Sequence, residues 1–161
     1  MIVGGNNRQN VAHQLTGGSA NDLMFGGRPD DRIHGGDGQD VIYAGSGDDV
    51  LWGDAGADFL LGEDGDDTYI VDNSDDRVIE AFGGGFDTVA STVDYTLSRN
   101  VEQLILEGDD SISGTGNEQD NVIIGNNANN ILDGGLGADS MAGGSGDECE
   151  EIPVDSVIVH A

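Results

Sequence analysis

Residues 17–70 read GGSANDLMF, GGRPDDRIH, GGDGQDVIY, AGSGDDVLW, GDAGADFLL and GEDGDDTYI, which are six consecutive segments of nine residues. Glycine fills most of positions one, two and four. Position six is always aspartate: Asp22, Asp31, Asp40, Asp49, Asp58 and Asp67. Position eight is always a large apolar residue: Met24, Ile33, Ile42, Leu51, Leu60 and Tyr69. A period of this kind over consecutive segments predicts a parallel β-solenoid.

Each repeat divides into a turn and a short strand. Around the apolar position the side chains alternate, so the middle one points inward and its two neighbours point outward. The glycine-rich residues form the turn, because glycine permits positive φ angles. Two repeats make one coil, and coils stack about 4.8 Å apart. Turns two repeats apart therefore lie above one another, and their aspartates and carbonyls form rows of oxygen ligands that suit a hard cation such as calcium.

The repeats resemble those of the RTX family, the haemolysin-type calcium-binding repeat proteins. The resemblance implies an all-β fold, a right-handed parallel β-roll, with calcium held between turns two repeats apart. It pairs Asp22 with Asp40, Asp40 with Asp58, Asp31 with Asp49, and Asp49 with Asp67. Backbone carbonyls of the turns would complete the sites, among them those of Gly26, Gly27, Gly35, Gly36, Gly38, Gly45, Gly47, Gly53, Gly56 and Gly65.

The four expected sites differ in the quality of their turns. Ala20 and Pro29 replace the glycine at position four in the first two repeats, and the ring of Pro29 fixes a negative φ. We therefore expect the best-formed sites between Asp40 and Asp58 and between Asp49 and Asp67.

The period also divides the 161-residue chain, which we expect to form one elongated domain. The expected parts are a cap at 1–16, the calcium roll at 17–70, a metal-free β segment at 71–115, a degenerate second repeat block at 116–148 and a tail at 149–161. In the cap, His13 stands where a repeat has aspartate, either as a capping residue or as a metal ligand. In the second block position six holds Asn121, Asn130, Asp139 and Glu148. Because asparagine offers a neutral oxygen, we expect weaker sites there. Glu150 at an inward position predicts that the solenoid ends near Cys149.

The composition is strongly acidic. The chain has 32 acidic residues, five basic residues that are all arginine, and a formal net charge of −27. This charge disfavours nucleic acid and anionic membranes as partners, and it makes the metal-free chain repel itself. A disordered chain is the alternative, but the periodic aspartates argue against it. No apolar run is long enough to span a membrane, and the single Cys149 excludes an internal disulfide.

The sequence contains no His-Glu-x-x-His zinc motif and no Gly-x-Ser-x-Gly nucleophile motif, so we expect no enzymatic activity. Two function classes remain. The first is a calcium-binding module, free or part of a larger secreted protein, that folds on calcium binding after type I secretion. The second is an extracellular adhesion or ligand-binding protein. A fragment of a secreted hydrolase without its catalytic domain is a more distant alternative.

Both ends of the chain bear on export. Residues 1–5 lack the pattern of a Sec-type signal peptide. The resemblance implies the type I secretion apparatus as a partner, an extracellular location, and an uncleaved C-terminal signal. The end EEIPVDSVIVHA, residues 150–161, either is such a signal or forms a capping strand.

One outer face of the roll is expected to be apolar. Repeats one, three and five place their strands side by side, with six outward side chains: Leu23, Phe25, Val41, Tyr43, Phe59 and Leu61. A contiguous apolar face of this size usually marks an interface. We expect it to be covered by the 1–16 lead-in, by the 152–161 tail, by a second copy of the chain in a homodimer, or by a surface ligand.

Overall fold

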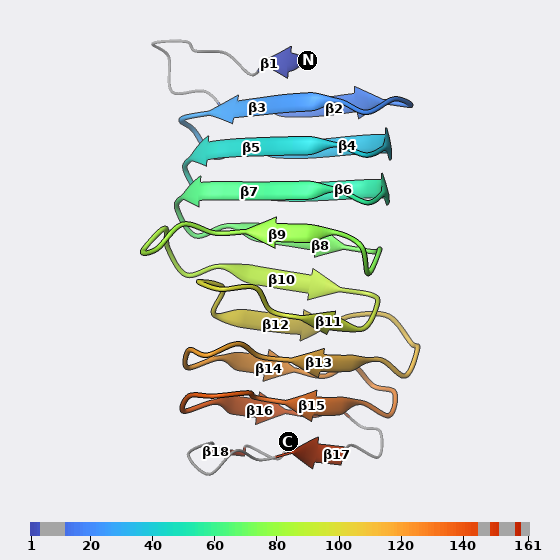
Figure 1. Cartoon of the computed structure of the whole chain (residues 1–161), viewed down its shortest axis with the longest axis vertical. Helices are drawn as coiled ribbons and strands as arrows, with labels where there is room; N and C mark the ends of the chain where they lie inside the picture. Colours follow the sequence, from blue (N-terminus) through green and yellow to red (C-terminus); the bar gives the residue numbers. More distant parts are fainter. Residues whose placement is uncertain (4–11, 145–148, 152–156, 159–161) are drawn as a thin grey trace.

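The computed structural model describes residues 1–3, 12–144, 149–151 and 157–158. Within these ranges the chain forms strands, turns and bends and no helix. Figure 1 shows the strands lying across the long axis, stacked as successive coils from the N-terminal end to the C-terminal end. Every strand pair is parallel. The predicted all-β parallel β-solenoid is therefore confirmed.

The strands form three sheets. The first has five strands: β1 (Ile2–Val3), β3 (Leu23–Gly27), β5 (Val41–Ser46), β7 (Phe59–Asp64) and β9 (Arg77–Ile79). The second has nine: β2 (Gln14–Gly18), β4 (Arg32–Gly38), β6 (Val50–Gly56), β8 (Thr68–Val71), β10 (Thr88–Ser91), β12 (Gln103–Leu106), β14 (Val122–Ile124), β16 (Ser140–Ala142) and β18 (Val157–Ile158). The third has four: β11 (Tyr95–Thr96), β13 (Ser113–Thr115), β15 (Ile131–Asp133) and β17 (Cys149–Glu151).

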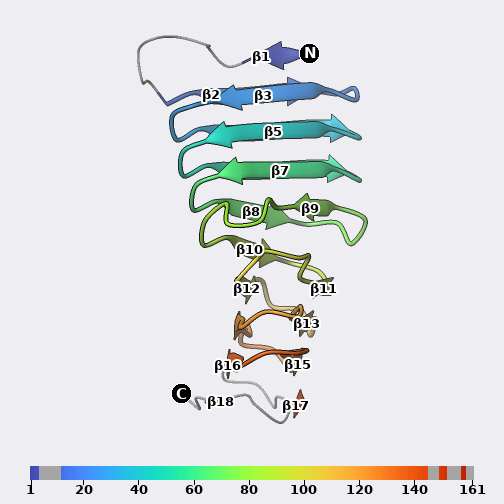
Figure 2. The same cartoon turned by 60° about the vertical axis from the view of Figure 1, so that its left-hand side comes forward.

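The register follows the nine-residue period. Met24 pairs with Ile42, and Ile42 pairs with Leu60, so each coil of the first block contains two repeats. The turned view in Figure 2 shows β3, β5 and β7 one below another. The predicted coil of turn, strand, turn and strand is therefore observed. The nine-stranded sheet runs through both repeat blocks and joins them into one stack.

The core is a column of inward side chains between the sheets. In the first block it consists of the six residues at position eight, each fully buried: Met24, Ile33, Ile42, Leu51, Leu60 and Tyr69. Further along the chain the column continues with Val78, Val89, Leu104, Ile123, Leu132 and Met141. Most strands contribute one large side chain to it, while β8 and β12 contribute a second, Val71 and Leu106, so the core is narrow.

The turns stack closely enough to require glycine at some positions. Gly36 and Gly45 have φ angles of 100° and 117°. A Cβ on either residue would collide with the carbonyl oxygen of the turn one coil earlier, at Gly18 or Gly27. Backbone oxygens of one turn therefore lie directly against the next.

The structure differs from the sequence prediction at the C-terminal end. The solenoid was expected to end near Cys149, yet β17 pairs with β15 and β18 pairs with β16. These ladders are backbone hydrogen bonds, so they do not require an apolar residue at position 150. Residues 152–156 and 159–161 of the expected tail lie outside the described residues.

Candidate metal centres

The aspartates of position six form two ladders, one along each edge of the solenoid. Each precedes a strand, and its carboxylate reaches back to the coil before. Asp31 N–H donates to Asp49 Oδ1 at 2.6 Å, and Asp49 N–H donates to Asp67 Oδ1 at 2.8 Å. On the other edge Asp40 N–H donates to Asp58 Oδ1 at 2.7 Å. One carboxylate oxygen of each aspartate thus binds the neighbouring coil.

The second carboxylate oxygen has a different environment. Seven Oδ2 atoms are buried and accept no hydrogen bond from the described residues: those of Asp31, Asp40, Asp49, Asp58, Asp67, Asp76 and Asp87. Turn carbonyls lie beside them. A Cβ built on Gly35 would contact Asp40 Oδ2 and lie 2.6 Å from the carbonyl oxygen of Gly53. A Cβ on Gly26 would lie 2.7 Å from Asp31 Oδ2 and contact the carbonyl oxygen of Ala44.

The Oδ2 atoms therefore lie near turn carbonyl oxygens and accept no hydrogen bond from the described residues. A buried, unpaired carboxylate oxygen next to carbonyl oxygens is unfavourable unless a cation is present. A hard divalent ion with six to eight oxygen ligands, which calcium prefers, fits this donor set. The residues of the first block therefore fit a calcium ion in the turns.

The pKa values of the ladder carboxyls also show that the ionised forms are unfavourable in the fold without a cation. Burial raises the pKa of Asp49 to about 7, that of Asp58 to about 6 and that of Asp67 to about 8, and repulsion from neighbouring carboxylates adds to the effect. The backbone N–H bond to each carboxylate opposes the rise without cancelling it. A cation in the turns would favour the ionised forms.

The first members of the ladders are the least enclosed. Asp22 N–H donates to Asp40 Oδ1 at 2.7 Å, but the side chain of Asp22 is 19% exposed and its Oδ2 accepts the Gly18 N–H at 3.0 Å. His13 begins the other ladder. Its N–H donates to Asp31 Oδ1 at 2.6 Å, and its Nδ1 lies 3.0 Å from the same atom. His13 thus holds the backbone position of an aspartate, as its place in the frame indicated.

The ladders continue into the segment that the sequence predicted to be free of metal. Asp58 N–H donates to Asp76 Oδ1 at 3.0 Å, and Asp67 N–H donates to Asp87 Oδ1 at 2.9 Å. Sequence reasoning missed both residues. Asp76 could have been found from its place nine residues after Asp67 and from Val78 at the inward position. The signal was hidden because this segment contains no glycine. Asp87 falls out of the frame by two residues.

The second repeat block uses asparagine differently from the aspartates of the first. Asn121 Nδ2 donates to the carbonyl oxygen of Val101 at 3.0 Å, and Asn130 Nδ2 donates to that of Ile112 at 2.9 Å. Among the described residues at position six of this block, Asp139 alone has a carboxylate, and its Oδ1 accepts the Asn121 N–H at 2.9 Å. Neutral amides thus make the bonds between coils, so this block gathers less negative charge than the first.

The turn glycines predicted as carbonyl ligands lie along both edges. Those with φ angles in the left-handed region are Gly27, Gly36, Gly38, Gly45, Gly47, Gly56 and Gly65. Asp54 and Glu63 replace glycine at position two and adopt φ angles of 58° and 79°. The backbone therefore keeps a positive φ angle at position two where glycine is absent.

Comparison with known proteins gives one match. A family model described as RTX calcium-binding nonapeptide repeat (4 copies) matches residues 16–51, 43–78 and 115–147, together more than half of the chain. The matched segments include both repeat blocks and Asp76. No curated protein and no solved structure matches the chain. Among the described residues there is no helix long and apolar enough to cross a membrane.

Proposed function

Because the chain belongs to the family of RTX calcium-binding nonapeptide repeat proteins, we propose that it is a secreted module whose β-solenoid forms only when calcium binds its turns. Calcium is its cofactor. The observation that carries the proposal is the set of buried Oδ2 atoms without hydrogen-bond partners along the two aspartate ladders. The β-solenoid is a structural calcium-binding module and not a catalytic fold.

The energetics support calcium-dependent folding. The proposed sites between Asp40 and Asp58 and between Asp49 and Asp67 combine two carboxylates each with turn carbonyls. A site at ten times its dissociation constant adds about 1.4 kcal/mol to the free energy of unfolding, so four sites add roughly 6 kcal/mol. That is comparable to the whole stability of an ordinary domain. Extracellular calcium modules bind at about 10⁻⁴–10⁻³ M, so the chain would stay unfolded in a low-calcium cytosol.

The family and this folding behaviour support export through a type I secretion apparatus. An unfolded chain can pass a narrow channel and fold in the calcium-rich exterior. We propose an extracellular location and a chain that is free or part of a larger secreted protein. Deletion of residues 152–161 should abolish export, while calcium binding by the purified chain is retained. Normal export of the shortened chain would reject the tail as a secretion signal and would favour the capping strand.

The test of the calcium proposal compares two substitutions. Asp49→Ala should remove two bound ions, because the Asp49 carboxylate is shared between the coils that contain Asp31 and Asp67. Asp22→Ala should remove one. Native mass spectrometry counts the ions, and circular dichroism with and without a chelator reports folding. A β-type spectrum that is unchanged by the chelator would contradict the proposal.

A specific surface supports the second function class. On β3, β5 and β7 the predicted apolar face is present: Leu23 and Phe59 are 37% and 42% exposed, and the rings of Phe25 and Tyr43 stack with centroids 5.3 Å apart. In the described part of the lead-in, β1 pairs edge to edge with β3 in this same sheet and β2 belongs to the other sheet. The strand β18 of the tail lies at the far end of the stack. The remaining segments expected as a lid, 4–11, 152–156 and 159–161, lie outside the described residues.

A homodimer or a surface ligand is therefore the alternative use of this face. Phe59→Asp adds a charge there without touching a ladder aspartate. Sedimentation and glycan-array binding should then change while calcium affinity stays the same. An unchanged oligomeric state and unchanged glycan binding would argue against any role of this face in association.

A further inference from the structure

The turn between β9 and β10 is longer than the turns of the repeats. In the regular frame the next aspartate follows the inward residue by seven positions, as Asp76 follows Tyr69. Asp87 follows Val78 by nine. Two extra residues therefore widen the turn at 80–87, on the edge of the solenoid that carries Asp67.

Glu80 begins this wide turn at a place where most repeats have glycine. It follows Ile79, and Ile79 pairs with Leu61, which is followed by Gly62. The turn after β5 has only the small Ala44 at this place, and a Cβ on Gly62 would collide with Asp67 Oδ2, so the turn after β7 has no room for a side chain. The widened turn accommodates one, and Glu80 is 8% exposed.

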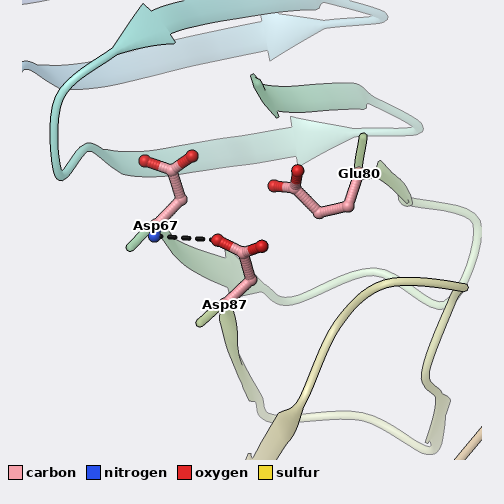
Figure 3. A group of neighbouring side chains, drawn as sticks. All are labelled: Asp67, Glu80 and Asp87. Carbon is pink, nitrogen blue, oxygen red and sulfur yellow. Dashed lines mark hydrogen bonds between the residues drawn. The ribbon is translucent and has the colours of Figure 1, made fainter. Parts of the chain in front are cut away.

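Three carboxylates meet at this point. Asp67 precedes β8, Asp87 precedes β10, and Glu80 enters from the end of β9 (Figure 3). Each offers one oxygen, and the three oxygens lie within 4.8 Å of one another. Two oxygens that bind the same calcium ion at about 2.4 Å lie at most about 4.8 Å apart, so the spacing suits a single ion.

Hydrogen bonds fix these carboxylates but leave oxygens unpaired. The Tyr69 hydroxyl donates to Glu80 Oε1, and the Ala81 N–H donates to Glu80 Oε2 at 3.0 Å. Asp67 N–H donates to Asp87 Oδ1 at 2.9 Å. The Oδ2 atoms of Asp67 and Asp87 have no partner among the described residues, in side chains that are only 1% and 0% exposed.

No arginine in the described part of the chain forms an ion pair with these three groups, and the sequence contains no lysine. We propose that Asp67, Glu80 and Asp87 form a calcium site with three carboxylates. This site differs from the repeat sites and binds calcium more tightly than they do. This inference rests on the proposed calcium binding of the repeats. A repeat site receives two carboxylates, and calcium affinity rises with the number of charged ligands. The site is filled first as calcium rises.

The test uses the full chain with Glu80→Gln, which removes one charge and keeps an oxygen acceptor for the Tyr69 hydroxyl. Glu107→Gln is the matched control, because Glu107 is exposed and does not belong to the cluster of three carboxylates. Calorimetric calcium titration should show one tight class of site in the wild-type chain. Glu80→Gln should weaken that class by about tenfold or more, a change of about 1.4 kcal/mol. The weaker sites and the control should be unchanged.

A second variant separates charge from packing. Tyr69→Phe removes the hydrogen bond to Glu80 and keeps all three carboxylates, so the tight class should persist. If the wild-type chain folds on calcium but Glu80→Gln leaves its tightest class intact, the site is rejected and the proposed function stands. If Tyr69→Phe abolishes the tight class as fully as Glu80→Gln does, the effect comes from packing and the site is also rejected. A wild-type chain that binds no calcium overturns both proposals.

Discussion

The substitution Asp49→Asn should change stability in opposite directions with and without calcium. In the metal-free fold the carboxylate of Asp49 is buried, and its Oδ2 accepts no hydrogen bond from the described residues. The asparagine carbonyl oxygen can still accept the Asp31 N–H, which Asp49 Oδ1 accepts at 2.6 Å. The charge disappears, and the bond between the coils remains.

The magnitude follows from the pKa of Asp49. Burial raises this pKa from 3.8 to about 7 in the metal-free fold. At about 1.4 kcal/mol per pH unit, the ionised group costs the metal-free fold up to about 4 kcal/mol at neutral pH. Asparagine removes this cost, so the metal-free free energy of unfolding should rise by up to that amount. In saturating calcium the variant also loses a carboxylate shared by two sites. A hundredfold loss of affinity at each site lowers the binding contribution by about 5.5 kcal/mol, which exceeds the gain of the metal-free fold, so the calcium-loaded chain should be less stable.

The assay is urea denaturation followed by circular dichroism. One series contains calcium, and the other contains a chelator and an osmolyte that populates the fold. Asp37→Asn is the control, because it makes the same charge change at an exposed side chain in a neighbouring turn. Changes of the same sign in both series, or an equal effect of Asp37→Asn, would refute the reasoning.

Three further predictions concern protons, the core and the second block. In the presence of a chelator, the content of β-structure should increase as the pH falls from about 8 to about 5. The raised pKa values of Asp49, Asp58 and Asp67 mean that the fold binds protons more tightly than the unfolded chain does, so the fold loses stability as the pH rises. A spectrum that is independent of pH would exclude this linkage. Leu60→Ala should lower the stability of the calcium-loaded chain by about 2–5 kcal/mol in urea, because Leu60 is fully buried in the single core column; a loss below this range would show that the coils relax around the cavity. Asn121→Asp should make the stability of the second block more dependent on calcium, since the variant loses the donor to the Val101 carbonyl and gains a charge. Hydrogen exchange of β14 with and without calcium measures this dependence, and equal protection in both conditions would argue against it.

The nine-residue period was sufficient to predict the coil, the parallel pairing and the inward side chains. These depend on alternation and on turn length, which are local. Asp76 was missed because its repeat, VDNSDDRVI, has no glycine, although its aspartate and Val78 keep the frame. Glu80 lay beyond sequence reasoning for a different reason. Its carboxylate meets Asp67 only because two extra residues open the turn, and nothing in the local sequence gives the path of that turn.

The end of the solenoid was mispredicted for a physical reason as well. The apolar pattern stops at 149, but strand pairing in β17 and β18 uses backbone groups, which every residue except proline can supply. Side-chain patterns therefore locate the core better than they locate the last strand. The asparagines of the second block were also only partly understood from the sequence. Their position suggested weaker metal sites, but in the structure their amide groups donate hydrogen bonds to the neighbouring coil.

The orientation of the ladders has a mechanical consequence. The strands lie across the long axis, and β1 and β18 lie at opposite ends of the stack, so the hydrogen bonds between coils run along the axis (Figure 1). A force that separates the two ends loads these bonds one coil at a time, as in unzipping, and does not shear several strands together. Each coil of the first block contains 18 residues, and its release adds roughly 60 Å of extended chain. Calcium ions bound between the turns, as proposed, would hold neighbouring coils together along the direction of the force. The force needed to open a coil should then rise with the calcium concentration.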